Sequence, residues 1–205
     1  MKVVCIGNSI VKGFPHRQGQ SFPSVLRERT GWQVINKGVN GDSTSMVLRR
    51  FPADVLAHQP DKVLILTGAN DFIYQTASPM EAMKNIEQMI DMSQENGIET
   101  VLLTPLQCNP PQAAQEWMAG ESVDYQVVNQ KLSELSTLIR SAAIARGCAM
   151  VDLGLKYIGF GKYHDGLHPT SEGQEWIAQC IIEELLGEKN HETRGQEEAK
   201  KQKKE

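Results

Sequence analysis

The types and spacing of Ser9, Asp165 and His168 meet the requirements of acyl transfer through a covalent serine intermediate. Ser9 follows a short apolar run and the pair Gly7-Asn8, and Asp165 lies three residues before His168. A serine hydroxyl becomes a nucleophile when a histidine accepts its proton, and a carboxylate orients that histidine and stabilises its charged form. We therefore predict that Ser9 is the nucleophile, His168 the general base and Asp165 the orienting carboxylate.

Gly41 and Asn70 have the properties of oxyanion donors. Gly41 has no side chain, so its N–H can approach a reacting carbonyl closely. Asn70 follows another apolar run and offers a neutral side-chain amide. Purely local roles are an alternative explanation: Ser9 could be a helix cap, and Gly41 could belong to a tight turn. The catalytic interpretation therefore depends on a fold that brings them together.

Short apolar runs alternate with helical patterns along most of the chain. Strands are predicted at residues 3–6, 33–36, 63–67, 100–104 and 149–152. Helices are predicted at residues 22–29, 45–58, 80–96 and 125–146, and a last helix from near Thr170 to about Leu186. This alternation predicts an α/β fold with a parallel sheet covered on both faces. Because the carboxyl ends of parallel strands share one edge, the fold would bring Ser9, Asn70 and His168 together.

The length and composition predict a single catalytic domain over residues 1–187. Residues 188–205 alternate acidic and basic side chains and contain almost no apolar ones, so we expect a disordered tail there. Residues 105–124 contain three prolines and are predicted to form a long loop with room for one helical turn. This loop leaves the sheet at the same edge as Ser9.

The bulk properties narrow the classes of partner and compartment. A formal net charge of −4 disfavours nucleic acid, and no apolar run has the length of a membrane span. The chain passes from Met1 and Lys2 directly into a strand-like run without the pattern of a secretory signal. The four cysteines are scattered, with no C-x-x-C spacing, which is typical of a reducing compartment. We expect a cytoplasmic protein of unknown oligomeric state.

His164, Asp165 and His168 also permit a metal-site interpretation, as in a metal-dependent phosphoesterase. Histidines four residues apart converge on one metal ion only when they lie on a helix. Gly166 and Pro169 disfavour a helix in this segment. We therefore favour the serine mechanism and expect no bound metal.

Four segments of the chain resemble, in order, the signature blocks of the SGNH hydrolases, also called GDSL esterases/lipases. They are Gly7-Asn8-Ser9-Ile10, Gly38-Val39-Asn40-Gly41-Asp42-Ser43-Thr44, Gly68-Ala69-Asn70-Asp71 and Asp165-Gly166-Leu167-His168-Pro169. The resemblance implies a flavodoxin-like three-layer α/β/α sandwich with a five-stranded parallel sheet. It also implies a triad of Ser9, Asp165 and His168, an oxyanion hole of Ser9, Gly41 and Asn70, and no cofactor. Asn8 departs from the family pattern, which usually has aspartate there.

The resemblance implies a serine esterase that acts on a small-molecule ester, and we expect short to medium acyl chains. A carbohydrate acetylesterase and a lysophospholipase or thioesterase of the same family remain alternatives, as does a non-enzymatic, flavodoxin-like ligand-binding module. The turn at residues 12–20 and the loop at residues 105–124 are expected to shape the substrate pocket. Their candidate substrate-binding residues are Phe14, Gln107, Trp117 and Met118.

Overall fold

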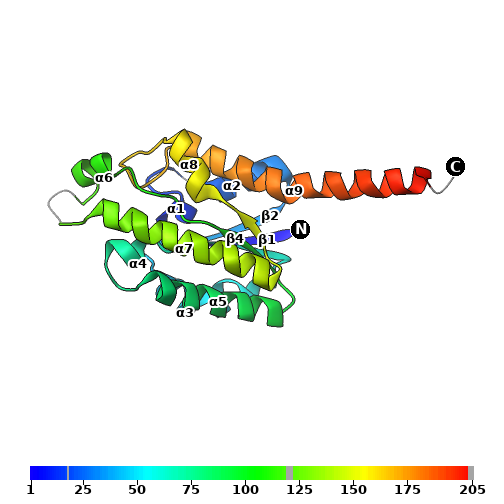
Figure 1. The fold of residues 1–205 in the computed structure, drawn as a ribbon, viewed down its shortest axis with the longest axis horizontal. Coiled ribbons are helices and arrows are strands. Elements are labelled where there is room, and N and C mark those ends of the chain that lie inside the picture. Colours follow the sequence, from blue (N-terminus) through cyan, green and yellow to red (C-terminus); the bar gives the residue numbers. More distant parts are fainter. Residues whose placement is uncertain (18, 119–121, 203–205) are drawn as a thin grey trace.

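A sheet of five parallel strands lies at the centre of the computed structural model, which describes residues 1–17, 19–118 and 122–202 (Figure 1). The strands are β1 Lys2–Gly7, β2 Gln33–Gly38, β3 Lys62–Leu66, β4 Glu99–Leu103 and β5 Ala149–Val151. Their order in the sheet is β2-β1-β3-β4-β5. The predicted α/β fold is confirmed, and this strand order is the flavodoxin-like one.

Three strands end level with one another at the carboxyl edge of the sheet. Gly7 of β1 pairs with Gly38 of β2 on one side and with Leu66 of β3 on the other. The segments that follow these strands carry Ser9, Gly41 and Asn70, respectively. The register therefore brings three sequence-distant polar groups to one edge.

Helices cover both faces of the sheet. One layer contains α3 (Thr44–Asp54), α5 (Pro79–Glu95) and α7 (Tyr125–Arg146), and the other contains α2 (Phe22–Thr30), α8 (Leu153–Phe160) and α9 (Ser171–Gln202) (Figure 1). Shorter helical segments are α1 (Ser9–Lys12), η1 (Leu56–His58), α4 (Ala69–Ile73) and α6 (Pro110–Glu116). The molecule is thus the three-layer α/β/α sandwich that the motif resemblance implied.

Each face of the sheet has its own apolar core. Val4 and Ile6 of β1 belong to a cluster that includes Phe51 of α3. Val3 of the same strand points to the opposite face, in a cluster with Phe22 of α2. Successive side chains of a strand alternate between faces, and β1, which lies inside the sheet, is apolar on both because both faces are covered.

The structure contains short helices that the sequence patterns did not predict. The segments α1 and α4 begin directly after β1 and β3 and are four and five residues long. The helix α8 follows β5, and α6 is the turn allowed for in the long loop. Helices of this length carry too few apolar repeats for periodicity to detect.

The last helix is longer than predicted. It continues through residue 202, whereas we expected it to end near Leu186. Glu, Lys, Gln and Ala dominate residues 188–202 of the sequence, and these residues have high helix propensity. Figure 1 shows this end of α9 extending away from the sheet. The final residues of the predicted tail, 203–205, lie outside the described residues.

Over the described part of the chain, no helix combines the length and the apolar composition of a membrane-spanning segment.

Candidate active site

Ser9 lies where β1 turns into α1. An added Cβ at Gly7 would overlap the carbonyl oxygen of Leu66, so the turn requires glycine. Asn8 caps α1, and its Oδ1 accepts the N–H of Ile10 at 3.1 Å. Asparagine therefore keeps the capping oxygen that aspartate would supply and loses only the charge. The Ser9 Oγ lies 2.8 Å from Nε2 of His168.

Asp165 holds His168 through both oxygens of its carboxylate. Its Oδ2 lies 2.8 Å from Nδ1 of His168. Its Oδ1 accepts the backbone N–H groups of Leu167 at 3.0 Å and of His168 at 2.8 Å. The tight turn between Asp165 and His168 is thus closed by the same carboxylate that orients the imidazole.

The ionised Asp165 carboxylate determines which ring nitrogen of His168 carries the proton. Burial raises the pKa of the Asp165 carboxyl, but the hydrogen bonds from His168 and Leu167 outweigh burial and hold this pKa below its ordinary value. An ionised carboxylate only accepts hydrogen bonds, so Nδ1 of His168 carries the proton. Nε2 is then free to accept the proton of the Ser9 hydroxyl. This geometry confirms the predicted Ser-Asp-His triad.

Gly41 and Asn70 face Ser9 across one small pocket. The pocket has a volume of about 220 Å³ and is lined by Ser9, Phe14, Asn40, Gly41, Asn70, Tyr74, Trp117 and His168. Gly41 has a φ of 82°, in the left-handed region that favours glycine. The Nδ2 of Asn70 donates to the carbonyl oxygen of Asp42 at 2.9 Å, which fixes the amide and leaves its second N–H available.

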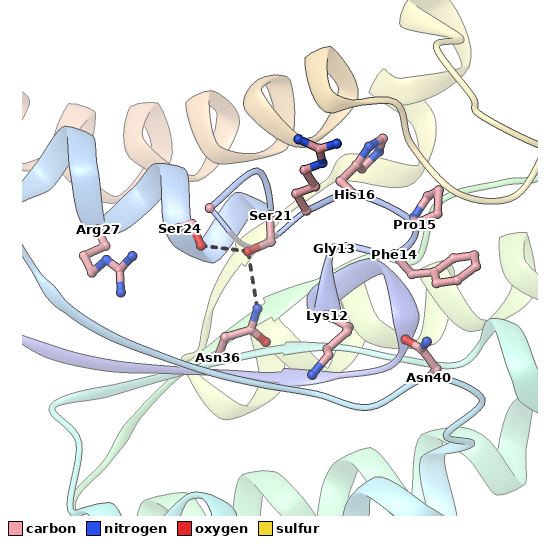
Figure 2. Close-up of a pocket in the computed structure, with 12 residues that line it drawn as sticks. Lys12, Gly13, Phe14, Pro15, His16, Ser21, Ser24, Arg27, Asn36 and Asn40 are labelled. Atoms are coloured by element: carbon pink, nitrogen blue, oxygen red, sulfur yellow. Dashed lines mark hydrogen bonds between the residues drawn. The ribbon is translucent and has the colours of Figure 1, made fainter.

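Two aromatic side chains pack against the catalytic imidazole. The ring of Phe14 meets that of His168 edge-on at a centroid distance of 4.8 Å, and the ring of Trp117 does so at 4.6 Å. Phe14 comes from the loop after α1, shown in Figure 2, and Trp117 follows α6. Both line the pocket, as we predicted for substrate-binding residues.

Gln107 and Met118 lie outside this pocket in the described structure. The Nε2 of Gln107 donates to the hydroxyl of Ser133 on α7 at 2.6 Å. Met118 packs against the apolar cluster on the α5 and α7 side of the sheet. The structure therefore does not bring these two residues together with Ser9, because their side chains fasten the loop to the body of the domain.

The histidines near the triad have structural contacts. His16 places its Nε2 2.8 Å from the carbonyl oxygen of Pro169, and its ring meets the ring of His164 at 6.2 Å. The backbone N–H of His164 donates to the carbonyl oxygen of His168. Among the described residues, no three His, Cys, Asp or Glu side chains are grouped as metal ligands.

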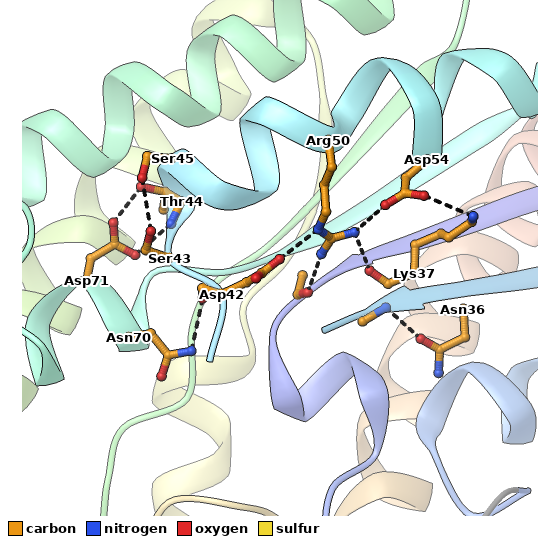
Figure 3. A network of polar contacts seen from close by, with 12 residues as sticks. Asn36, Lys37, Asp42, Ser43, Thr44, Ser45, Arg50, Asp54, Asn70 and Asp71 are labelled. Carbon is orange, nitrogen blue, oxygen red and sulfur yellow. Dashed lines mark hydrogen bonds and ion pairs between the residues drawn. The ribbon is translucent and has the colours of Figure 1, made fainter. Parts of the chain in front are cut away.

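Arg50 of α3 joins the backbone of the strand ends around the site (Figure 3). Its guanidinium donates to the carbonyl oxygens of Gly7 and Lys37, both at 2.8 Å. It also pairs with the carboxylates of Asp42 and Asp54, both at 2.7 Å. Arg50 was not among the predicted site residues, although its spacing of four from Asp54 on a predicted helix is a signal of an ion pair. The network fixes the turn before Ser9 against the Gly41 loop.

Asp71 fastens the Asn70 segment to the start of α3. Its carboxylate accepts the N–H and the hydroxyl of Thr44, at 2.8 and 2.6 Å, as Figure 3 shows. Burial raises the pKa of the Asp71 carboxyl, and the hydrogen bonds from Thr44 offset this only in part. These contacts give Asp71 a structural role.

The comparisons with known proteins agree with this geometry. A model of the GDSL-like lipase/acylhydrolase family matches residues 5–176 of the chain. The chain belongs to this family. The resemblance inferred from four sequence segments is thus confirmed, and so is the assignment as an ester hydrolase with a Ser-Asp-His triad.

Individual relatives of this GDSL-like hydrolase cover most of its length. An arylesterase of Vibrio mimicus is 28% identical over 190 residues, which are 90% of this chain and 88% of the relative. The thioesterase 1/protease 1/lysophospholipase L1 of Escherichia coli strain K12 is 22% identical over 196 residues, which are 93% of this chain and 86% of the relative. The crystal structure of a lipase/acylhydrolase from Enterococcus faecalis has a TM-score of 0.76 at 23% identity, covering 91% of this chain and 96% of that one. This last likeness shows a shared fold.

Proposed function

We propose that this GDSL-like hydrolase cleaves carboxylic esters with short to medium acyl chains through an acyl-enzyme on Ser9. The observation that carries the proposal is the connected geometry of the triad. Ser9 Oγ lies 2.8 Å from Nε2 of His168, and Nδ1 of His168 lies 2.8 Å from Asp165. All three residues are buried, and Ser9 and His168 line the pocket.

In this mechanism, Oγ of Ser9 attacks the ester carbonyl carbon while Nε2 of His168 accepts the hydroxyl proton. The Asp165 carboxylate stabilises the imidazolium that forms. His168 then returns the proton to the departing alkoxide oxygen as the carbon–oxygen bond breaks, which leaves the acyl group on Ser9. A water molecule, deprotonated by His168, attacks the acyl-enzyme, and the acid is released with the proton restored to Ser9.

The oxyanion hole belongs to the proposal. The backbone N–H groups of Ser9 and Gly41 and the Nδ2 of Asn70 would donate to the carbonyl oxygen as it gains negative charge. Support comes from the shared pocket and from the contact between Asn70 and the Asp42 carbonyl, which aligns the amide before substrate binds. Donors that are fixed in advance need no reorganisation during the reaction.

The size of the pocket supports small acyl groups. Its volume of about 220 Å³ lies below the roughly 300–1,000 Å³ of pockets that enclose drug-sized ligands. Phe14, Tyr74 and Trp117 give it an aromatic wall, which suits an apolar acyl chain. An acetyl group also fits such a space, so a carbohydrate acetylesterase remains the second candidate.

We also propose a cytoplasmic location. The four cysteines are free, which supports this proposal.

The test is hydrolysis of p-nitrophenyl acetate, butyrate, octanoate and palmitate by the wild-type protein and by Ser9→Ala, each with and without EDTA. We expect activity to be highest on acetate and butyrate, to vanish in Ser9→Ala and to ignore EDTA. Preference for palmitate would contradict the acyl-chain proposal, and activity retained in Ser9→Ala would contradict the mechanism. Acetylated xylose, compared with the simple esters, separates the acetylesterase alternative.

A further inference from the structure

The helix that carries the nucleophile, α1, is too short to hold its own orientation. It has four residues, about one turn, and Ser9 is the first of them. A single helical turn is unstable unless contacts from outside the helix fix it. Ile10 and Val11 pack into the apolar cluster that also contains Ile177 of α9, but apolar contacts are not directional. The direction of the Ser9 side chain therefore depends on the hydrogen bonds that reach the backbone of α1.

Gln174 of α9 supplies one of these hydrogen bonds. Its side chain is fully buried, and its Nε2 donates to the carbonyl oxygen of Ile10 at 3.1 Å. Its Oε1 accepts the backbone N–H of Phe22, at the start of α2, at 2.8 Å. Both ends of the amide are thus bonded to backbone groups, and one of these groups belongs to the residue next to the nucleophile.

The first turn of α9 holds Gln174 at a fixed place relative to His168. The backbone N–H of Gln174 donates to the carbonyl oxygen of Thr170 at 2.9 Å. The hydroxyl of Thr170 accepts the N–H of Gly173 at 3.2 Å. An added Cβ at Gly173 would lie only 2.8 Å from Cβ of Pro169, so the turn packs directly on the residue that follows His168. Gln174 therefore belongs to the segment that carries the base.

A second hydrogen bond runs in the opposite direction. His16 lies on the loop after α1, shown in Figure 2, and its Nε2 is 2.8 Å from the carbonyl oxygen of Pro169. A carbonyl oxygen only accepts hydrogen bonds, so Nε2 of His16 carries a proton and donates. The same loop is anchored at the nucleophile, because the N–H of Phe14 donates to the carbonyl oxygen of Ser9 at 3.0 Å. His16 thus connects the segment of the nucleophile to the residue that follows the base.

The two bonds form a reciprocal bridge between the segments that carry the catalytic pair. Gln174 reaches from the segment of the base to the carbonyl oxygen beside the nucleophile, and His16 reaches from the segment of the nucleophile to the carbonyl oxygen beside the base. We propose that these two side chains are positioning residues that hold Oγ of Ser9 at 2.8 Å from Nε2 of His168. Proton transfer needs this short distance, and a misplacement of about 1 Å can cost about 10²-fold in rate. The inference rests on the Ser9 mechanism of the proposed function and not on its acyl chain length.

Gln174→Met tests the contact from α9, because methionine has a similar shape and provides no donor for the Ile10 carbonyl. We expect kcat on p-nitrophenyl butyrate to fall by about 10²-fold. KM should change little, since Gln174 is not among the residues that line the catalytic pocket. Circular dichroism and a thermal melt establish that the variant is folded at the assay temperature. Wild-type kcat in the folded variant, or a rise in KM as large as the fall in kcat, would overturn the proposal.

Gln94→Met is the matched control. The Nε2 of Gln94 also donates to a backbone carbonyl oxygen of another helix, that of Arg146 at 3.0 Å. Gln94 lies at the end of α5, just before β4 begins, and so at the edge of the sheet opposite Ser9. The same substitution there should leave kcat and KM at their wild-type values. A fall in kcat equal to that of Gln174→Met would overturn the specific role of the α9 contact.

His16 allows a second test on a side chain that is only partly buried, so its substitution should leave the protein folded. His16→Phe keeps an aromatic ring against His164 and removes the donor, whereas His16→Gln keeps an N–H donor. We expect kcat to fall by about tenfold in His16→Phe, as for the loss of one hydrogen bond, and to recover in His16→Gln. Equal kcat in the two variants would overturn the role of His16.

Labelling with a fluorophosphonate measures the nucleophile without any ester. Oγ of Ser9 forms a bond to phosphorus, fluoride leaves, and the hydroxyl proton passes to His168. Mass spectrometry of the intact protein gives the second-order rate of labelling. We expect this rate to fall in Gln174→Met and His16→Phe by about the same factors as kcat. Labelling of both variants at the wild-type rate would overturn the positioning role.

The same probe separates this inference from the proposed function. A wild-type protein that is labelled at Ser9 but hydrolyses none of the four p-nitrophenyl esters would refute the acyl-chain proposal, and slower labelling of the variants would then still support the bridge. Ester hydrolysis by the wild-type protein, with unchanged kcat and labelling in the variants, would refute the bridge and keep the esterase.

Discussion

Asp165 connects backbone structure to chemistry within a single side chain. One carboxylate oxygen closes the turn by accepting two backbone N–H groups, and the other fixes the proton position on His168. The turn and the tautomer therefore depend on the same ion. A substitution that keeps the turn but changes the tautomer of His168 therefore isolates the catalytic contribution of Asp165.

Asp165→Asn is such a change. The amide oxygen can still accept the N–H groups of Leu167 and His168, but its NH₂ then faces Nδ1 of His168 and favours the tautomer with the proton on Nε2. We expect kcat to fall by about 10⁴-fold, as orienting aspartates of serine triads typically contribute. Steady-state hydrolysis of p-nitrophenyl butyrate measures this, with circular dichroism as the control for folding. A loss below tenfold would contradict the tautomer argument.

The lowered pKa of Asp165 also predicts a pH dependence of stability. A carboxyl whose pKa is lower in the folded chain stabilises the native state above its unfolded value of about 3.9, and this contribution is lost as the pH falls. The wild-type protein should exceed Asp165→Asn in free energy of unfolding at pH 7, and the difference should shrink as the pH falls below about 5. Urea unfolding of both proteins between pH 3 and 7 measures it. A difference that is constant over this range would refute the expectation.

Asn70 gives a third prediction at the residue scale. Its amide is held by the Asp42 carbonyl, so Asn70→Ala removes an aligned donor and little else. We expect kcat to fall by about 10²–10³-fold with a much smaller change in KM, because the hydrogen bond matters most when the oxyanion forms. Initial rates over a range of substrate concentrations separate the two. Equal losses in kcat and in substrate binding would count against the oxyanion role.

At the scale of elements, Arg50 links α3 to the strand ends around the catalytic site. We expect Arg50→Met to lower kcat more than it changes KM and to reduce the free energy of unfolding by about 1–3 kcal/mol, since buried carbonyl and carboxylate acceptors lose their donor. Arg50→Lys should restore little, because an ammonium cannot reach Gly7, Lys37 and Asp42 at once. Paired kinetics and urea unfolding test this. Full recovery in Arg50→Lys would show that charge alone suffices.

The sequence was sufficient to locate the long elements but not all the short ones. All five predicted strands begin and end within two residues of the observed ones, because apolar runs bounded by Gly, Asn and Asp mark buried parallel strands clearly. By contrast, α1 and α4 are defined by the strand ends that precede them and have no periodicity of their own. The contacts of Arg50 depend on carbonyl groups in two different strands, so no local pattern could specify them.

The candidate site was also predictable only in part. The catalytic residues could be predicted because their side chains have the required chemistry and the topology brings them to one edge of the sheet. They are Ser9, Asp165 and His168. Phe14 and Trp117 line the pocket as predicted, whereas Gln107 and Met118 do not, because side-chain direction in an irregular loop follows no period.

At the scale of the whole molecule, the end of α9 extends away from the catalytic domain. The end of α9, residues 188–202, extends away from the sheet, so a chain that stops at Gly187 should retain kcat/KM and the thermal unfolding temperature of the full chain (Figure 1). Ester hydrolysis and a thermal melt of the two forms compare them. Loss of activity in the shorter chain would mean that this segment contacts the domain.

The nucleophile and its base are 159 residues apart in the sequence and 2.8 Å apart in space. A ribosome synthesises Ser9 directly after the first strand and His168 only after all five strands have been made. A nascent chain therefore has no activated serine, and ester hydrolysis begins only when nearly the whole domain has left the exit tunnel and closed. Ester hydrolysis by a nascent chain therefore reports that all five strands have been synthesised and have folded around the site.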